Sequence, residues 1–358
     1  MKIVLAFDSY KGCLSAEDVC EAAKEGVLAV ARDAEVVCVP LSDGGEGLVD
    51  CFLRMGKGRA VQVRVHGPLM EEVLATYALS EDGKTAYMEM SSACGLMLVP
   101  VEQRNPMETT TYGLGEMLVD VIERGVCRVV LGIGGSATCD GGMGMLEALA
   151  SWQEAKGGWQ EAGQSLRLTV ACDVDNPLYG NDGAAYVFAP QKGATPEQVE
   201  LLDRRLRAFA LATEELGLAE RVDAFSPGAG AAGGLGYALQ AYLNADLCSG
   251  VEIVLDECGF DDVLRGADVV LTGEGCSDGQ TLHGKVAAGV LRRARKWGVK
   301  TVLMSGQIKD REALAAAGFD CLVCVNEDDG RPLDELMQSD VAMDNIRSAC
   351  QRMMEDFQ

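Results

Sequence analysis

Short apolar runs recur along the chain, separated by longer stretches in which apolar residues repeat every three or four positions. The short runs predict β-strands at residues 2–7, 35–40, 61–65, 87–90, 128–132, 169–172, 268–272, 300–304 and 321–325. The longer stretches predict helices at residues 15–30, 110–124, 285–297 and 311–317. Ser15, with Asp18 three residues later, is typical of a helix N-cap.

This alternation predicts an α/β fold with doubly wound, mainly parallel sheets, in which ligands bind at the carboxyl ends of strands. A chain of 358 residues is long enough for two domains. Both ends of the chain look doubly wound, whereas most glycine-rich loops lie in the middle. We therefore expect a discontinuous Rossmann-like α/β domain (1–60 and 265–358), an inserted α/β domain (61–264), and an active site in the cleft between them.

The composition points to a cytoplasmic protein. No apolar run is long enough to span a membrane, and residues 2–7 are too short for the core of a signal peptide. The fourteen cysteines are scattered, several inside apolar runs, which is typical of reduced, buried thiols. A zinc site is improbable, because Cys321 and Cys324 form the one Cys-x-x-Cys motif and the chain has only two histidines. The sequence leaves room for a homo-oligomer.

The formal net charge of −24 argues against nucleic acid as a partner. An acidic protein that handles nucleotides needs local devices instead, namely backbone amides, a few lysines and a divalent cation held by carboxylates. Loops that combine glycine with acidic residues fit this requirement, because glycine lets the backbone approach an anion and a cation can lie between carboxylate and phosphate. Loops rich in one or both residue types occur at residues 8–12, 43–47, 132–142, 173–176, 228–236 and 273–278.

Several of these loops also have other interpretations. Residues 132–137 follow a strand and fit the dinucleotide pattern G-x-G-x-x-[GA], but the acidic residue expected about twenty positions on is not convincing. Residues 228–233 fit it again without a preceding strand, and packing against a neighbour explains them equally well. Residues 279–285 resemble a P-loop, but Val286 stands where Ser or Thr would hold Mg²⁺. Lys285 can still contact a phosphate as a point charge at a helix start.

Taken together and in order, the loops resemble the glycerate kinase family of the bacterial glycerate 2-kinase type. The matching stretches are residues 8–16, 43–47, 104–113, 132–138, 171–178, 190–195, 228–236, 271–275 and 278–282. The resemblance implies two α/β domains, ATP and Mg²⁺ as cofactors, and phosphorylation of D-glycerate to 2-phosphoglycerate. Two departures stand out: Cys139 replaces the family's usual Asn, and Cys276 replaces its usual Arg, which removes a potential clamp on an anion.

Phosphoryl transfer requires in-line positioning, charge neutralisation and a group that receives the hydroxyl proton. For cofactor binding we expect the loop residues Gly134, Gly135, Ser136, Thr138 and Asp140, together with Lys285. As catalytic residues we expect Lys11, Asp43, Asp173, Lys192, Glu274 and Asp278, of which Asp173, Glu274 and Asp278 are the candidate Mg²⁺ ligands. The alternatives are a kinase for a related hydroxy acid, a 3-phosphoglycerate-forming kinase, an NAD-dependent oxidoreductase and a non-catalytic ligand sensor.

Overall fold

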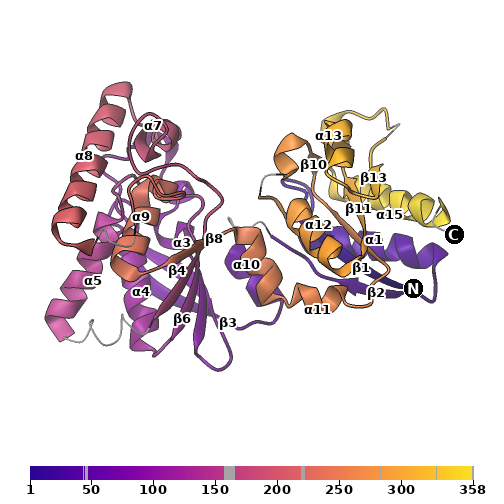
Figure 1. The fold of residues 1–358 in the computed structure, drawn as a ribbon, viewed down its shortest axis with the longest axis horizontal. Coiled ribbons are helices and arrows are strands. Elements are labelled where there is room, and N and C mark those ends of the chain that lie inside the picture. The colour runs from indigo at the N-terminus through magenta and orange to yellow at the C-terminus, as the bar shows by residue number, and fades with distance from the viewer. Residues whose placement is uncertain are drawn as a thin grey trace. The chain divides into compact units, whose positions relative to one another are not determined.

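The structure, a computed structural model, describes residues 1–42, 44, 47–156, 166–218, 222–282, 284–327 and 329–356. The chain forms two compact units (Figure 1): unit 1 comprises Met1–Asp43 and Val251–Gln358, and unit 2 comprises Gly44–Gly250. The domain limits predicted from the sequence lie at 60/61 and 264/265, and they stay a prediction. The expected α/β class with mainly parallel sheets is confirmed.

Unit 1 is built on a five-stranded parallel sheet with the order β13-β11-β9-β1-β2. Its strands are β1 (Lys2–Phe7), β2 (Glu35–Cys38), β9 (Val269–Gly273), β11 (Lys300–Ser305) and β13 (Cys321–Cys324). Every residue of β9 is buried, as expected for a parallel strand covered on both faces. The strand order runs outward in opposite directions from β1 and β9, which makes their carboxyl ends a topological switch point.

Helices cover both faces of this sheet. The helices of the unit are α1 (Ala16–Val30), α10 (Gly250–Glu257), α11 (Phe260–Leu264), α12 (Val286–Trp297), α13 (Arg311–Ala316), α14 (Leu333–Leu336) and α15 (Ser339–Asp356). α1 and α15 bury their apolar residues against Val302 and Met304 of β11, whereas α12 and α13 pack around Leu303 on the opposite face. The predicted cap of α1 is confirmed, because Ser15 and Asp18 form a reciprocal capping box.

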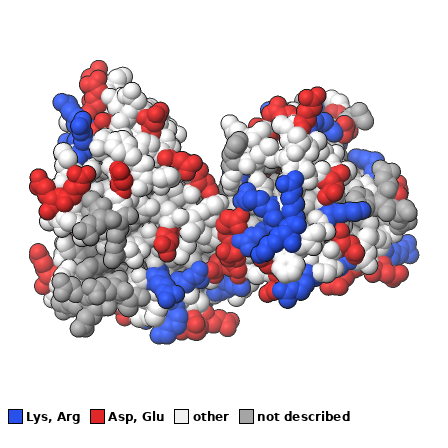
Figure 2. Space-filling view, viewed as in Figure 1, with Lys and Arg blue, Asp and Glu red and all other residues white. Residues whose placement is uncertain are grey.

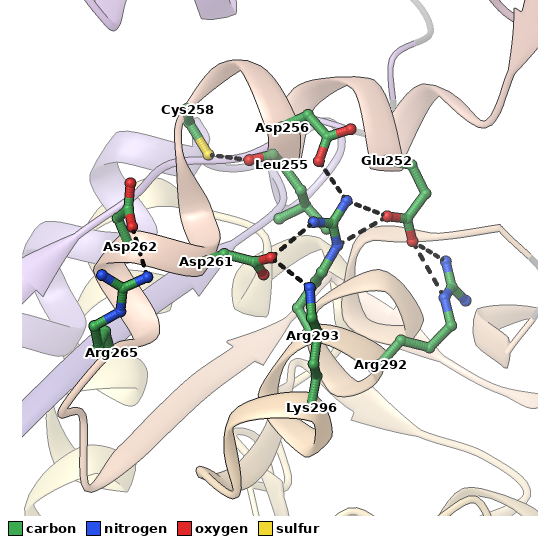
Figure 3. A network of polar contacts seen from close by, with 10 residues as sticks. All are labelled: Glu252, Leu255, Asp256, Cys258, Asp261, Asp262, Arg265, Arg292, Arg293 and Lys296. Carbon is green, nitrogen blue, oxygen red and sulfur yellow. Dashed lines mark hydrogen bonds and ion pairs between the residues drawn. The ribbon is translucent and has the colours of Figure 1, made fainter.

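A network of ion pairs fastens α10 and α11 to α12 (Figure 3). Arg293 of α12 donates to Glu252 and Asp256, each at 2.6 Å, and Lys296 donates to Asp261 at 2.9 Å. In the space-filling view, basic side chains gather over this part of unit 1 and acidic ones border them (Figure 2). Because the guanidinium of Arg293 already contacts carboxylates, the network is a clamp between helices rather than an anion site.

Unit 2 contains a six-stranded sheet with the order β3-β4-β5-β6-β7-β8. Its strands are β3 (Arg59–His66), β4 (Glu72–Leu79), β5 (Thr85–Glu89), β6 (Arg128–Gly132), β7 (Arg167–Ala171) and β8 (Asp246–Cys248). β5 to β8 pair in parallel, so their carboxyl ends share one edge of the sheet. β4 pairs antiparallel with both β3 and β5, and neither β4 nor β8 is among the predicted strands.

The helices of unit 2 enclose two apolar cores. They are α2 (Leu48–Arg54), α3 (Ser91–Cys94), α4 (Tyr112–Glu123), α5 (Met143–Lys156), α7 (Ala184–Phe188), α8 (Pro196–Glu215) and α9 (Ala231–Leu243), with the 3₁₀ turns η1 (Leu96–Leu98), η2 (Val101–Gln103) and η3 (Pro190–Lys192). α4, α5 and α9 pack on the sheet, and α7 and α8 form a second core with the outer side of α9. No helix in the described part of the chain has the length and apolarity needed to cross a membrane. All fourteen cysteines lie in that part and are free thiols.

Candidate active site

A cavity of about 350 Å³ lies in unit 2 beyond the carboxyl ends of β6 and β7. It is lined by Gly44, Leu96, Phe188 and residues 133–136, 171–174, 191–192 and 231–232. The position agrees with the rule that α/β sheets bind ligands at the carboxyl ends of their parallel strands. Of the residues predicted from the sequence, Gly134, Gly135, Ser136, Asp173 and Lys192 line this cavity.

The glycine loop after β6 is held in place by the segment that follows α3. Gly95 pairs with Ser136 as an isolated β-bridge, and Leu96 N donates to Gly135 O at 2.8 Å. Gly135 has a φ of +71°, a left-handed conformation that side-chain-bearing residues rarely adopt. The loop therefore presents a fixed backbone to the cavity, which is the property that anion binding by backbone amides requires.

Lys192 is the buried cation of this site. The residue is the last one of η3, the turn that follows α7, and it is only 3% exposed. The ammonium group donates to Ser136 Oγ at 2.6 Å and to Thr138 O at 2.7 Å. Burial lowers the pKa of Lys192 to about 8, although Cys139 and Asp140 partly oppose this shift. Because an ammonium carries three donors, the two contacts leave one for a ligand.

Thr138 and Asp140 hold the loop itself. Thr138 uses its carbonyl group for Lys192, and its buried hydroxyl has no hydrogen-bond partner among the described residues. One oxygen of Asp140 accepts from Thr111 N and Thr111 Oγ1, both at 2.8 Å, and from Gly144 N at 3.2 Å. The other oxygen accepts from Gly142 N at 3.0 Å. Asp140 thus satisfies amide groups where α5 begins and ties them to the start of α4.

The glycine run at residues 228–236 packs against the same loop. Ala232, Gly233 and Gly234 have positive φ values and form a kink inside α9. A Cβ atom on Gly233 would lie 2.2 Å from Thr138 O, so only glycine fits there. Gly141 N donates to Gly233 O at 3.0 Å. The sequence leaves two interpretations of this run, a dinucleotide-type loop and close packing. Close packing accounts for Gly233, while Ala232 beside it lines the cavity.

Asp173 follows β7 at the edge of the cavity and is exposed. One of its carboxylate oxygens accepts from Gly250 N at 3.1 Å. Asp43, another of the predicted catalytic residues, lies outside the described residues.

Unit 1 carries a second group of predicted residues at the carboxyl ends of β1 and β9. Glu274 accepts from Lys285 at 2.8 Å through one oxygen and from Thr281 Oγ1 at 2.7 Å through the other. Lys285 is the N-cap residue of α12. Asp278 accepts from Gln280 N at 2.9 Å, which closes a turn. These hydrogen bonds bring Glu274 and Lys285 together and connect both to the start of α12.

Lys11 lies in the loop that follows β1, and its side chain is exposed. Asp8 in the same loop is 7% exposed, and its backbone N–H donates to Gly273 O at 3.0 Å. A Cβ atom on Gly275 would lie 3.8 Å from Lys11 N, so the loop runs beside the end of β9. At the switch point of unit 1, the loop that contains Lys11 therefore lies beside the loop that contains Gly273 and Glu274.

The predicted Mg²⁺ ligands do not form a cage within one unit. Asp173 belongs to unit 2, whereas Glu274 and Asp278 belong to unit 1. Within the described ranges, no group of three or more His, Cys, Asp or Glu side chains is placed to hold a metal ion. Moreover, Glu274 already pairs with a lysine. The roles of Asp173, Glu274 and Asp278 as Mg²⁺ ligands stay a prediction.

The sequence did not single out the apolar residues of the cavity, namely Leu96, Ile133, Val174 and Phe188. Isolated apolar residues in loops carry no chemical signature. The one usable signal was the spacing between Phe188 and Lys192, which lie four positions apart as on one face of a helical turn.

The two cysteines that depart from the family pattern differ in their surroundings. Cys139 is 2% exposed in the second core of unit 2, and burial raises the pKa of its thiol to about 11. Cys276 lies in the short strand β10 (Cys276–Ser277), which pairs with β12 (Gln307–Ile308). It is half-buried, with its thiol 3.7 Å from Gln307 Oε1.

Comparison with known proteins gives one consistent result. A family model described as "Glycerate kinase family" matches residues 3–358. A glycerate kinase of Bacillus subtilis (strain 168) is 42% identical over 347 residues, covering 91% of this chain and 90% of the relative. A glycerate 2-kinase of Escherichia coli (strain K12) is 40% identical over 368 residues, covering 97% and 95%.

A solved structure from Salmonella typhimurium LT2, of a protein proposed to be a glycerate kinase 2, superposes with a TM-score of 0.85. It is 39% identical, and the match covers 100% of this chain and 98% of that one. The chain therefore belongs to the glycerate kinase family.

Proposed function

We propose that the chain transfers the γ-phosphoryl group of ATP to D-glycerate and forms 2-phosphoglycerate in the cytoplasm. Family membership supports a kinase that acts on glycerate. The 2-position is supported by the name of the E. coli relative, a glycerate 2-kinase that is 40% identical to the chain.

The observation that carries this proposal is the buried ammonium of Lys192 beside the fixed glycine loop. Burying a cation is costly unless an anion compensates it. In the described part of the chain the contacts of the ammonium are a hydroxyl and a carbonyl oxygen, not a carboxylate. An anionic ligand in the cavity supplies the missing charge, and the phosphates of ATP have the required chemistry.

In this proposal the chain supplies positioning and charge. The backbone of Gly134 and Gly135 cradles the phosphates, and the hydroxyl of Ser136 keeps the Lys192 ammonium directed into the cavity. Lys192 neutralises charge on the transferred group as the transition state forms. Thr138 and Asp140 act indirectly, by holding Lys192 and the start of α5.

The residues of unit 1 complete the proposed site list. Lys11 and Lys285 provide further positive charge, and Glu274 holds Lys285 in place. Asp173 is the described carboxylate that lines the cavity, and we propose it, together with Asp43 and Asp278, as a candidate to receive the proton of the acceptor hydroxyl.

Mg²⁺ enters the proposal as the counter-ion of ATP, since Mg²⁺ in kinase sites is commonly bound by substrate phosphates, water and one or two carboxylates. It would reduce the negative charge of the phosphates. Its candidate ligands Asp173, Glu274 and Asp278 belong to both units, and the proposed steps rest on the chain's own donors.

The proposal is tested by a coupled assay of ADP release over a panel of small hydroxy acids, with the phosphorylated position read by phosphorus NMR. We expect D-glycerate to give the highest kcat/KM and the product to carry phosphate on C2. Phosphate on C3, or preference for another acid, would correct the reaction. ATP binding without ADP release would instead identify a ligand sensor. Full turnover in excess EDTA would remove Mg²⁺ from the proposal.

A further inference from the structure

The cavity of unit 2 has an apolar wall that phosphate binding leaves unused. The wall consists of Leu96 in η1, Val174 after β7 and Phe188 at the end of α7, with Ile133 and Ala232 beside them. Val174 is 36% exposed, and Leu96 and Phe188 are half-buried. Apolar side chains that face a cavity favour a ligand whose own apolar surface covers them.

The apolar wall and the ammonium group of Lys192 line the same cavity and are connected by short stretches of backbone. Phe188 lies four residues before Lys192, and both line the same cavity. The backbone N–H of Leu96 donates a hydrogen bond to the carbonyl oxygen of Gly135 in the glycine loop. A ligand with an anionic end and a flat apolar end would therefore contact both features at once. A three-carbon hydroxy acid has no surface that could cover this wall, whereas a purine nucleotide has both ends.

We infer that the purine base of the nucleotide packs on the wall formed by Leu96, Val174 and Phe188, with its phosphates toward Lys192. This inference rests on the proposed use of ATP and goes further, because it assigns the base to named side chains. Aromatic rings stack on any base, since every base has a π-face.

The wall also predicts weak discrimination between bases. In the described lining, the side chains able to form strong hydrogen bonds are those of Ser136, Asp173, Gln191 and Lys192. In the proposed function, Ser136 and Lys192 serve the phosphates and Asp173 faces the acceptor hydroxyl, which leaves Gln191 as the main side chain able to contact the edge of a base. We therefore expect GTP to replace ATP with a KM that rises no more than about tenfold, because shape and stacking select less strictly than paired hydrogen bonds.

The test compares Phe188→Ala with Tyr186→Ala. Tyr186 is the matched control, because it is an aromatic residue of the same helix, 41% exposed and outside the cavity lining. Calorimetric titration with ATP should give a Kd raised about tenfold for Phe188→Ala, from loss of one stacking contact, and within about twofold of wild type for Tyr186→Ala. Phe188→Trp should retain the wild-type Kd, and inorganic tripolyphosphate should bind all the variants equally.

An unchanged ATP affinity in Phe188→Ala would overturn the inference, as would an equal loss of tripolyphosphate affinity. Thermal melting of each variant checks folding, and Phe188→Leu provides a second variant that keeps apolar packing but removes the ring. Because the readout is binding, it stays informative even if the chain fails to phosphorylate glycerate. Such a failure would refute the proposed function and leave the base site to be decided by the titration.

Discussion

The two units each place a lysine beside a glycine-rich loop, but the two lysines have different partners. Lys192 of unit 2 is 3% exposed, and its contacts are the hydroxyl of Ser136 and a backbone carbonyl. The Lys285 side chain of unit 1 is 33% exposed and pairs with Glu274 at 2.8 Å. Among the described residues, no carboxylate contacts the first ammonium, whereas the second is already paired with one.

This difference separates a functional cation from a paired one. A buried ammonium that lacks an anion lowers the stability of the folded chain, so its presence indicates a use in ligand binding. A lysine paired with a carboxylate attracts a further anion only weakly, because the carboxylate repels that anion. We therefore expect Lys192 to dominate phosphate binding and Lys285 to contribute less.

The largest expected effect is that of Lys192→Met. Removing the charge that stabilises the transferred phosphoryl group should lower kcat/KM for ATP by about 100- to 1,000-fold. The melting temperature should stay the same or rise, because the cost of burying an ammonium disappears. Steady-state kinetics and thermal melting on the same protein measure both. Lys24→Met, at a half-buried position of α1 where the lysine pairs with Glu21, is the control and should leave kcat/KM unchanged. A loss below about tenfold would contradict the functional assignment of Lys192.

The pH dependence provides the next effect. Lys192 has a pKa lowered by burial to about 8, and activity needs its protonated form. kcat/KM for ATP should therefore fall about tenfold per pH unit above about 8. Stability should change in the opposite direction. Between pH 8 and 10.5, the ordinary pKa of lysine, the unfolded chain binds the proton more readily, so this group favours the folded state increasingly as pH rises.

Bound phosphate should raise the pKa of Lys192, so the break in the kcat profile should lie at higher pH than the break in kcat/KM. Both profiles are measured in one buffer series of constant ionic strength. In Lys192→Met the break attributed to Lys192 should be absent. If it persists, another group causes it.

The strand and helix pattern predicted much of the fold because parallel strands are continuous apolar runs. β1 matches its predicted limits, and the cap of α1 is the predicted pair Ser15 and Asp18. The prediction missed β4, whose sequence mixes Glu72, Thr76 and apolar residues without a clean alternation. It pairs with β3 across a turn in which Met70 has a φ of +65°, a conformation that the methionine at this position does not signal.

The candidate site was predictable in its loops but not in its contacts. Glycine marked the loop around Gly135 because only a flexible backbone forms such a loop. The pairing of Lys192 with Ser136 spans 56 residues, and no local pattern encodes it. Asp140 is a predicted nucleotide contact because of its place in a glycine loop, and the structure shows its carboxylate accepting amide hydrogens at a helix start. Its part in cofactor binding stays a prediction.

A smaller effect is expected from breaking the pair in unit 1. Lys285→Met should lower kcat/KM by about three- to tenfold, less than Lys192→Met, because Glu274 already compensates the charge. It should also lower the free energy of unfolding by about 2 kcal/mol, since the Glu274 carboxylate is left without its cation. The double variant Glu274→Gln, Lys285→Met should recover part of that stability. Chemical denaturation and kinetics of the three proteins check this. A loss as large as that of Lys192→Met would abolish the contrast between the units.

The smallest expected effect concerns Cys276, where the family usually has arginine. The half-buried position and the exposed neighbour Gln307 leave a guanidinium in contact with water, so Cys276→Arg should shift the melting temperature little. If an arginine there binds the carboxylate of glycerate, KM for glycerate should fall by about three- to fivefold, because solvent screens a charge-assisted hydrogen bond at such a position. KM for ATP should stay unchanged. Cys276→Gln, which fills similar space without charge, is the control. Equal KM values for glycerate in both variants would mean that the family arginine is structural, and a lowered melting temperature would show that the side chain is forced inward.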